Sequence, residues 1–124
     1  AMAALLVDLP TGADETVRRL AAKYPLYLLS NNNPISMART YQILENHGLE
    51  HTELFKEEFI SYYMKLMKPS RECYDYVAGK IGLPAGELLF IDDNMKNVEA
   101  AREAGWQARH YVPGSSLGKL LEDL

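Results

Sequence analysis

Three groups of polar residues in this sequence have types and spacings suited to phosphate or metal chemistry. Asp92 and Asp93 follow an apolar run, and two adjacent carboxylates offer the hard oxygen ligands that Mg²⁺ prefers. Lys68 precedes a proline, which keeps the lysine backbone extended, and a fixed ammonium suits a phosphate. Ser30 and Asn31 bring a hydroxyl, an amide and backbone N–H groups to the start of a predicted helix, where small anions bind.

Each group also has a purely structural interpretation. Asp93 could cap the helix that begins at Asn94, because a short acidic side chain accepts the first unpaired N–H groups of a helix. Ser30 and Asn31 could cap the following helix in the same way, and a Lys-Pro loop such as that of Lys68 is usually solvated. Taken one at a time, the groups leave both interpretations open.

Apolar runs alternate with amphipathic segments along the chain, and this alternation predicts an α/β fold. Strands are predicted within residues 26–29, 57–64, 88–91 and 107–112, and helices within residues 13–23, 35–47, 71–81, 94–104 and 117–124. The predicted architecture is a three-layer, Rossmann-like, mainly parallel sheet with helices on both faces. Ligands bind such sheets at the carboxyl ends of the strands, where all three polar groups would fall.

Length and composition narrow the class of protein. The 124 residues fit a single domain over positions 1–124, with 48% apolar and 24% charged residues. A net charge of −4 without a basic stripe argues against nucleic-acid binding, and no apolar run is long enough for a membrane span. The single cysteine, Cys73, predicts a cytoplasmic protein and no catalytic thiol, and the three histidines are too scattered for a metal site.

The order of the three groups resembles the haloacid dehalogenase-like (HAD) hydrolase superfamily, in the subgroup that carries a helical cap. The resemblance rests on the stretches 27–33, 64–69 and 90–98 and covers nearly the whole chain. It implies Mg²⁺-dependent phosphoryl transfer from a small phosphorylated metabolite. It also implies phosphate binding by Ser30, Asn31 and Lys68, with Ser30 and Lys68 acting in catalysis. It further implies Mg²⁺ binding by Asp93 and Asp92, and a bracing role for Asn97.

The family's first motif, an apolar strand ending in Asp-x-Asp, has a weak counterpart here. Asp8 fits the nucleophile position, but Pro10 stands where the acid/base would be, and proline cannot move a proton. We therefore expect a chain truncated at its N-terminus, with residues 1–12 as the remnant of the cap helix and hinge. Residues 3–8, which fit either a strand or the end of a helix, could fill the vacant central place in the sheet.

Two other arrangements could complete the sheet or cover its exposed face. One is a strand exchanged with a second copy of the chain, and the other is a homodimer. Candidate residues for such a surface are Tyr62, Tyr63 and Met64. The expected function is a HAD-type phosphatase that is inactive as this chain alone. The alternative function is a degenerate, non-catalytic binding or oligomerisation module. A phosphoacceptor receiver domain is rejected, because its acidic pair precedes its lysine and here Lys68 comes first.

Overall fold

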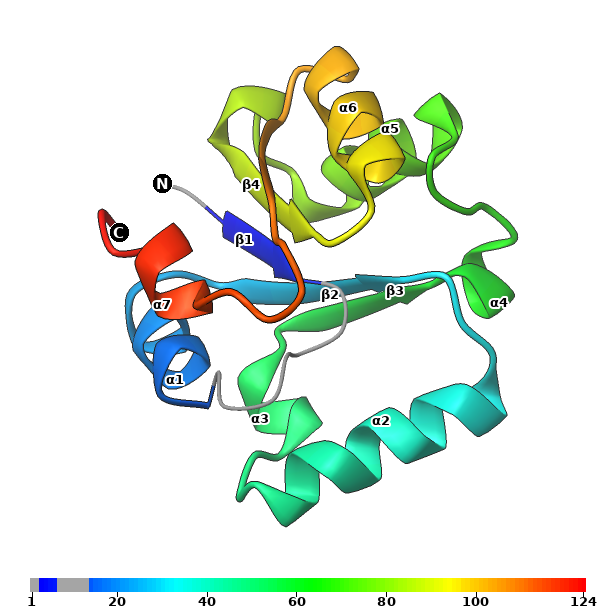
Figure 1. Ribbon diagram of the computed structural model, residues 1–124. Coiled ribbons are helices and arrows are strands. Elements are labelled where there is room, and N and C mark those ends of the chain that lie inside the picture. Colours follow the sequence, from blue (N-terminus) through cyan, green and yellow to red (C-terminus); the bar gives the residue numbers. More distant parts are fainter. Residues whose placement is uncertain (1–2, 7–13) are drawn as a thin grey trace.

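The computed structural model describes residues 3–6 and 14–124, in which a parallel sheet of five strands lies between two layers of helices (Figure 1). The strands are β1 (Ala3–Leu6), β2 (Leu26–Ser30), β3 (Glu57–Ile60), β4 (Leu88–Asp92) and β5 (Gln107–His110). The helices are α1 (Asp14–Lys23), α2 (Pro34–Asn46), α3 (His51–Leu54), α4 (Ser61–Met64), α5 (Arg71–Ile81), the 3₁₀ turn η1 (Ala85–Glu87), α6 (Met95–Glu103) and α7 (Leu117–Leu120). The predicted fold class is confirmed.

The strand β1 occupies the centre of the sheet. The order is β3-β2-β1-β4-β5, and every neighbouring pair is parallel. Leu5 lies in register with Tyr27 of β2 on one side and with Phe90 of β4 on the other. Residues 3–6 therefore form the central strand predicted over 3–8, while residues 7 and 8 lie outside the described residues.

Successive residues of each strand face opposite layers, as a strand covered on both faces requires. Ala4 and Leu6 belong to a core packed against α1, α2 and α7, whereas Ala3 and Leu5 belong to a core packed against α5 and α6. Figure 1 shows α5 and α6 on one side of the sheet and α1, α2, α3 and α7 on the other. Apolar residues on both sides of every central strand explain the continuous apolar runs in the sequence.

One predicted strand is shorter than expected. The run around Phe59–Tyr63 was predicted as a strand because aromatic residues favour strands, but β3 ends at Ile60 and α4 follows at Ser61. Tyr62 and Tyr63 leave the core at this point, with 50% and 65% of their surface exposed. Strand propensity fails here because the two rings are exposed and pack against each other, with centroids 5.2 Å apart, rather than in the core.

A polar cluster holds α2 and α3 against the edge strand β3. The Tyr41 hydroxyl donates to Glu58 Oε1 at 2.6 Å, His51 Nδ1 lies 2.7 Å from Glu58 Oε2, and the Tyr41 and His51 rings stack at 3.6 Å. Burial, and then the hydrogen bond to Glu58, raise the pKa of Tyr41 above its usual range, so the hydroxyl stays a donor.

Within the described residues, no helix combines the length and the apolarity needed to cross a bilayer.

Candidate active site

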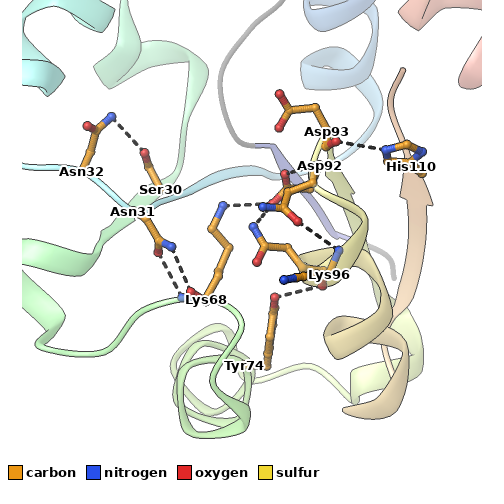
Figure 2. A network of polar contacts seen from close by, with 11 residues as sticks. Ser30, Asn31, Asn32, Lys68, Tyr74, Asp92, Asp93, Lys96 and His110 are labelled. Carbon is orange, nitrogen blue, oxygen red and sulfur yellow. Dashed lines mark hydrogen bonds and ion pairs between the residues drawn. The ribbon is translucent and has the colours of Figure 1, made fainter. Parts of the chain in front are cut away.

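The three polar groups singled out in the sequence meet at the carboxyl edge of the sheet (Figure 2). Ser30 ends β2 and Asp92 ends β4, on either side of the central strand, and both residues are buried. Lys68 reaches the same edge from the loop between α4 and α5. The sheet order thus joins residues that are up to 62 positions apart in the sequence (92 − 30).

A buried ion pair forms the centre of this site. Lys68 Nζ donates to Asp92 Oδ2 at 3.0 Å, and the two side chains are only 4% and 2% exposed. The Lys68 ammonium also lies 5.4 Å from the centroid of the Phe90 ring. Charges removed from water are tolerated only when they are paired and hydrogen-bonded, so the position of the ammonium depends on that of the carboxylate.

Further donors fix the Asp92 carboxylate. The Asn94 backbone N–H donates to Oδ1 at 2.9 Å, and Asn97 Nδ2 donates to Oδ2 at 3.0 Å. The Tyr74 hydroxyl donates to the Asn97 carbonyl at 2.9 Å, which ties α5 to the start of α6. Burial above all, with smaller electrostatic effects of the neighbouring Cys73 and Asp92, raises the pKa of Tyr74 above its usual range, so it remains a donor.

The Asn31 side chain positions Lys68 by its backbone. Asn31 Nδ2 donates to the Lys68 carbonyl and Asn31 Oδ1 accepts from the Lys68 N–H, both at 3.0 Å. Such a reciprocal pair mimics the hydrogen bonding of a neighbouring strand and places the lysine relative to the β2 turn. The Asn31 amide is thus committed to Lys68, and a phosphate-binding role predicted for this residue would fall to its backbone.

The Ser30 hydroxyl also has a defined partner. Asn32 Nδ2 donates to Ser30 Oγ at 3.2 Å, and the Asn32 N–H donates to Ser61 Oγ at 3.0 Å. The cap of α2 is Asn33, whose Oδ1 accepts from Ser36 N at 3.0 Å. Ser30 and Asn31 are therefore not the cap of this helix, which removes the structural interpretation of that pair.

Asp93 is exposed beside the buried pair. Its carbonyl lies 3.0 Å from His110 Nε2, and the cap of α6 is Asn94, so Asp93 is not the predicted helix cap. In residues 3–6 and 14–124, no three acidic, histidine or cysteine side chains cluster as a metal site. Mg²⁺ is commonly held by one or two carboxylates with phosphate oxygens and waters, so the donor chemistry of Asp92 and Asp93 fits this ion.

Several contacts at the site were absent from the sequence predictions. They come from Asn32, Asn94, Tyr74 and Ser61. Asn94 carried a usable signal, because asparagine at a helix start is a preferred cap. The other contacts join distant segments and carry no local pattern. The predicted nucleophile, Asp8, lies outside the described residues.

Cys73, on the buried face of α5, is predicted to be chemically inert in the folded chain. Burial raises the pKa of its thiol to about 11, against a smaller opposing effect of the Lys68 ammonium. At pH 8 only about one thiol in a thousand would then be ionised, and the thiolate is the reactive form. Alkylation by iodoacetamide, followed by mass spectrometry across a urea series, should track unfolding. Rapid modification without denaturant would contradict this prediction.

Comparisons with known proteins place this chain in a family. The profile of the haloacid dehalogenase-like hydrolase family matches residues 3–105. A D-ribitol-5-phosphate phosphatase of Bacteroides thetaiotaomicron is 28% identical over 89 residues, which cover 71% of this chain and 43% of the relative. An enolase-phosphatase E1 of Erwinia tasmaniensis is 38% identical over 60 residues, 47% of this chain and 26% of the relative. The chain thus spans less than half the length of these curated relatives.

Solved structures give the same result. A HAD family enzyme of Bacteroides thetaiotaomicron, in complex with magnesium and inorganic phosphate, matches with a TM-score of 0.83 and 30% identity over 92% of this chain and 58% of that one. A protein of Corynebacterium glutamicum matches over 99% of this chain and 92% of that one, with a TM-score of 0.73; at 22% identity this likeness shows the fold alone. The chain belongs to the haloacid dehalogenase-like hydrolase family.

Proposed function

We propose that this chain carries the phosphate- and magnesium-handling site of a phosphatase that acts on a small phosphorylated metabolite. The observation that carries the proposal is the buried Lys68–Asp92 pair at the carboxyl edge of the sheet, next to the Ser30 turn. Phosphoryl transfer depends mainly on positioning and on neutralising negative charge, and a fixed ammonium supplies both. The phosphatase names of the curated relatives and the magnesium and phosphate complex of the HAD family enzyme support the same reaction class.

On this proposal, the Ser30 turn and Lys68 bind the phosphoryl oxygens. Because Asn32 supplies a hydrogen bond that Ser30 Oγ accepts, the Ser30 hydroxyl can direct its own proton to a phosphoryl oxygen. The Asn31 backbone N–H is the further donor, while the Asn31 side chain positions Lys68. Lys68 offsets the negative charge of the phosphate and of an attacking carboxylate.

Asp93 and Asp92 would hold the magnesium ion. Asp93, which is exposed, would offer its carboxylate directly or through water, while Asp92 is already fixed by Lys68, Asn94 and Asn97. The bound ion would supply positive charge opposite the phosphoryl oxygens. Asn97 is a positioning residue, because it touches the Asp92 carboxylate and is itself held by the Tyr74 hydroxyl.

By sequence order Asp8, two positions after the central strand, is the one weak match to the nucleophile of the family's first motif. An aspartyl nucleophile needs a partner that transfers a proton, and Pro10 occupies the place expected for it. We therefore propose that this chain alone binds magnesium and phosphate but does not turn over a substrate. The same Pro10 favours a second candidate function, a non-catalytic binding module, which a stable dimer in light scattering would support.

Replacing Asp93 with asparagine should weaken Mg²⁺-dependent binding of inorganic phosphate by at least about tenfold, because a neutral amide is a poor ligand for a hard cation. Isothermal titration calorimetry with and without Mg²⁺ measures this effect. Asp75→Asn is the matched control. Asp75 is an exposed carboxylate that forms an ion pair with Arg71 at the protein surface. The Asp75→Asn variant should bind phosphate as the unchanged chain does.

Two outcomes would contradict the proposal. If the unchanged chain did not bind phosphate in the presence of Mg²⁺, the proposed phosphate and magnesium site would be wrong. Mg²⁺-dependent hydrolysis of 4-nitrophenyl phosphate by this chain, abolished by Asp93→Asn, would show instead that the chain is a complete catalyst. The second outcome would contradict the proposal that this chain alone is inactive, but it would still support phosphatase chemistry.

A further inference from the structure

A cleft of about 500 Å³ adjoins the phosphate site on the side of β3. It is lined by Asn31, Asn32, Asn33, Ser61, Tyr62, Lys65, Leu66 and Met67. Asn31 links the two places, because it lines the cleft and its side chain also binds the backbone of Lys68. A phosphate held at Ser30 and Lys68 would therefore have this cleft beside it, and the rest of the substrate could extend into it.

The lining favours a negatively charged occupant. Lys65 is the charged residue of the lining, and the eight described residues that form it include no acid. The Lys65 ammonium lies 4.7 Å from the centroid of the Tyr62 ring, which holds the flexible side chain over the cleft wall. A cleft with one cation and no carboxylate attracts anions and disfavours cations.

The hydrogen bonds around the cleft leave one of its asparagines with a donor for a ligand. Asn33 uses its side-chain oxygen to cap α2, accepting from Ser36 N at 3.0 Å, so its amide nitrogen is the part left for a ligand. The Ser61 hydroxyl accepts from the Asn32 N–H at 3.0 Å and donates to the Asn32 carbonyl at 3.3 Å, so it fixes the wall of the cleft rather than serving a ligand. An amide N–H donor of this kind can bind an oxygen of an anionic group that Lys65 attracts.

The backbone of Lys65 gives independent support. Lys65 has φ +60°, and it is the non-glycine residue with positive φ in the described part of the chain; the others are Gly48, Gly82, Gly105 and Gly114. At this C-terminal end of α4, glycine would adopt the left-handed conformation without the steric cost that a lysine bears. Costly backbone conformations are concentrated where the side chain serves a ligand.

We propose that the cleft holds the leaving group of the substrate and that Lys65 selects phosphate monoesters whose leaving group carries a carboxylate. This inference rests on the proposed function, because it requires a phosphate at Ser30 and Lys68. A carboxylate matches the single charge of Lys65, whereas a second phosphate, with nearly two negative charges, would call for more than one cation. The apolar side chains of Leu66 and Met67 then cover the short carbon chain between the two anionic groups.

The test compares two phosphate esters, one with a carboxylate and one with a hydroxymethyl group in its place, and uses inorganic phosphate as the reference. The affinities of 3-phosphoglycerate, glycerol 3-phosphate and inorganic phosphate are measured by isothermal titration calorimetry in the presence of Mg²⁺. The chain should bind 3-phosphoglycerate about fivefold more tightly than glycerol 3-phosphate, as expected for a partly solvated ion pair. Lys65→Gln should bring this ratio to about one and leave the affinity for inorganic phosphate unchanged.

Two further variants complete the design. Lys80→Gln, on α5, is the matched control. It removes the same charge and a similar contact, since Lys80 Nζ lies 5.7 Å from the centroid of the Tyr76 ring. This variant should preserve the fivefold ratio. Lys65→Gly removes the ammonium while easing the backbone, so it should fold and also lose the ratio.

The outcomes separate the two proposals. Equal affinities of the two esters for the unchanged chain, or a ratio that survives in Lys65→Gln, would overturn the role of Lys65 while the phosphate site stands. Absence of inorganic phosphate binding would overturn the proposed function and this inference with it.

Discussion

Replacing Lys68 with methionine is expected to lower the free energy of unfolding by about 3–5 kcal/mol, the usual cost of leaving one partner of a buried ion pair alone. Methionine keeps most of the volume of the lysine stem but removes the donor to Asp92 Oδ2. The Asp92 carboxylate would remain buried, with hydrogen bonds from the Asn94 N–H and the Asn97 amide but without the ammonium. Urea denaturation followed by circular dichroism measures the loss.

The matched control is Asp75→Asn, which breaks an ion pair of similar length at the surface and leaves the hydrogen bond from Arg71 Nη1 to the Glu103 carbonyl in place. Arg71 Nε and Asp75 Oδ1 are 3.0 Å apart, one helical turn from each other, with both side chains mostly exposed. Water screens such pairs, so this variant should lose no more than about 0.5 kcal/mol. The contrast between the two variants isolates burial as the cause of the larger loss.

A double-mutant cycle gives the coupling within the buried pair. Asp92→Asn alone removes the charge but leaves the Lys68 ammonium buried, so it should also be costly. In the Lys68→Met, Asp92→Asn double variant neither charge remains, and the loss should be smaller than the sum of the single losses by about 1–3 kcal/mol. Strict additivity, or a loss below about 1 kcal/mol for Lys68→Met, would mean that water reaches the pair.

Much of the fold was predictable because local patterns and burial agree. The apolar runs of β2 and β4 are buried along their whole length, and α5 ends at Gly82, whose φ of +80° is suited to glycine. The central place of β1 was also predictable, because two neighbouring strands with unpaired edges need a strand between them. The predictions failed where side chains leave the core, as at Tyr62.

The candidate site was predictable in its members but not in their contacts. Ser30, Lys68 and Asp92 could be placed at one edge, because each follows a predicted strand. The two hydrogen bonds between the Asn31 side chain and the Lys68 backbone join residues 37 positions apart. They form only if both loops are placed to within hydrogen-bonding distance of each other. Periodicity and helix-capping rules act over a few residues, so contacts of this kind lie beyond them.

The second large effect is expected in the central strand, where Leu5→Ala should lower the free energy of unfolding by about 2–5 kcal/mol. Leu5 is fully buried, pairs with Tyr27 and Phe90 on its two sides and packs in the core beneath α5 and α6. The substitution keeps the strand backbone but leaves a cavity that the surrounding rings cannot fill without moving. Urea denaturation again measures the loss.

Ile43→Ala is the control, because Ile43 is exposed on α2 and its replacement should change stability by no more than about 0.5 kcal/mol. If Leu5→Ala were as mild, residues 3–6 could not be the central strand. The strands β2 and β4 would then lie about 10 Å apart, two strand spacings, with facing rows of unpaired N–H and C=O groups. Since Ser30 ends β2 and Asp92 ends β4, the proposed phosphate site depends on β1 to keep these two strand ends at the distance that the sheet sets.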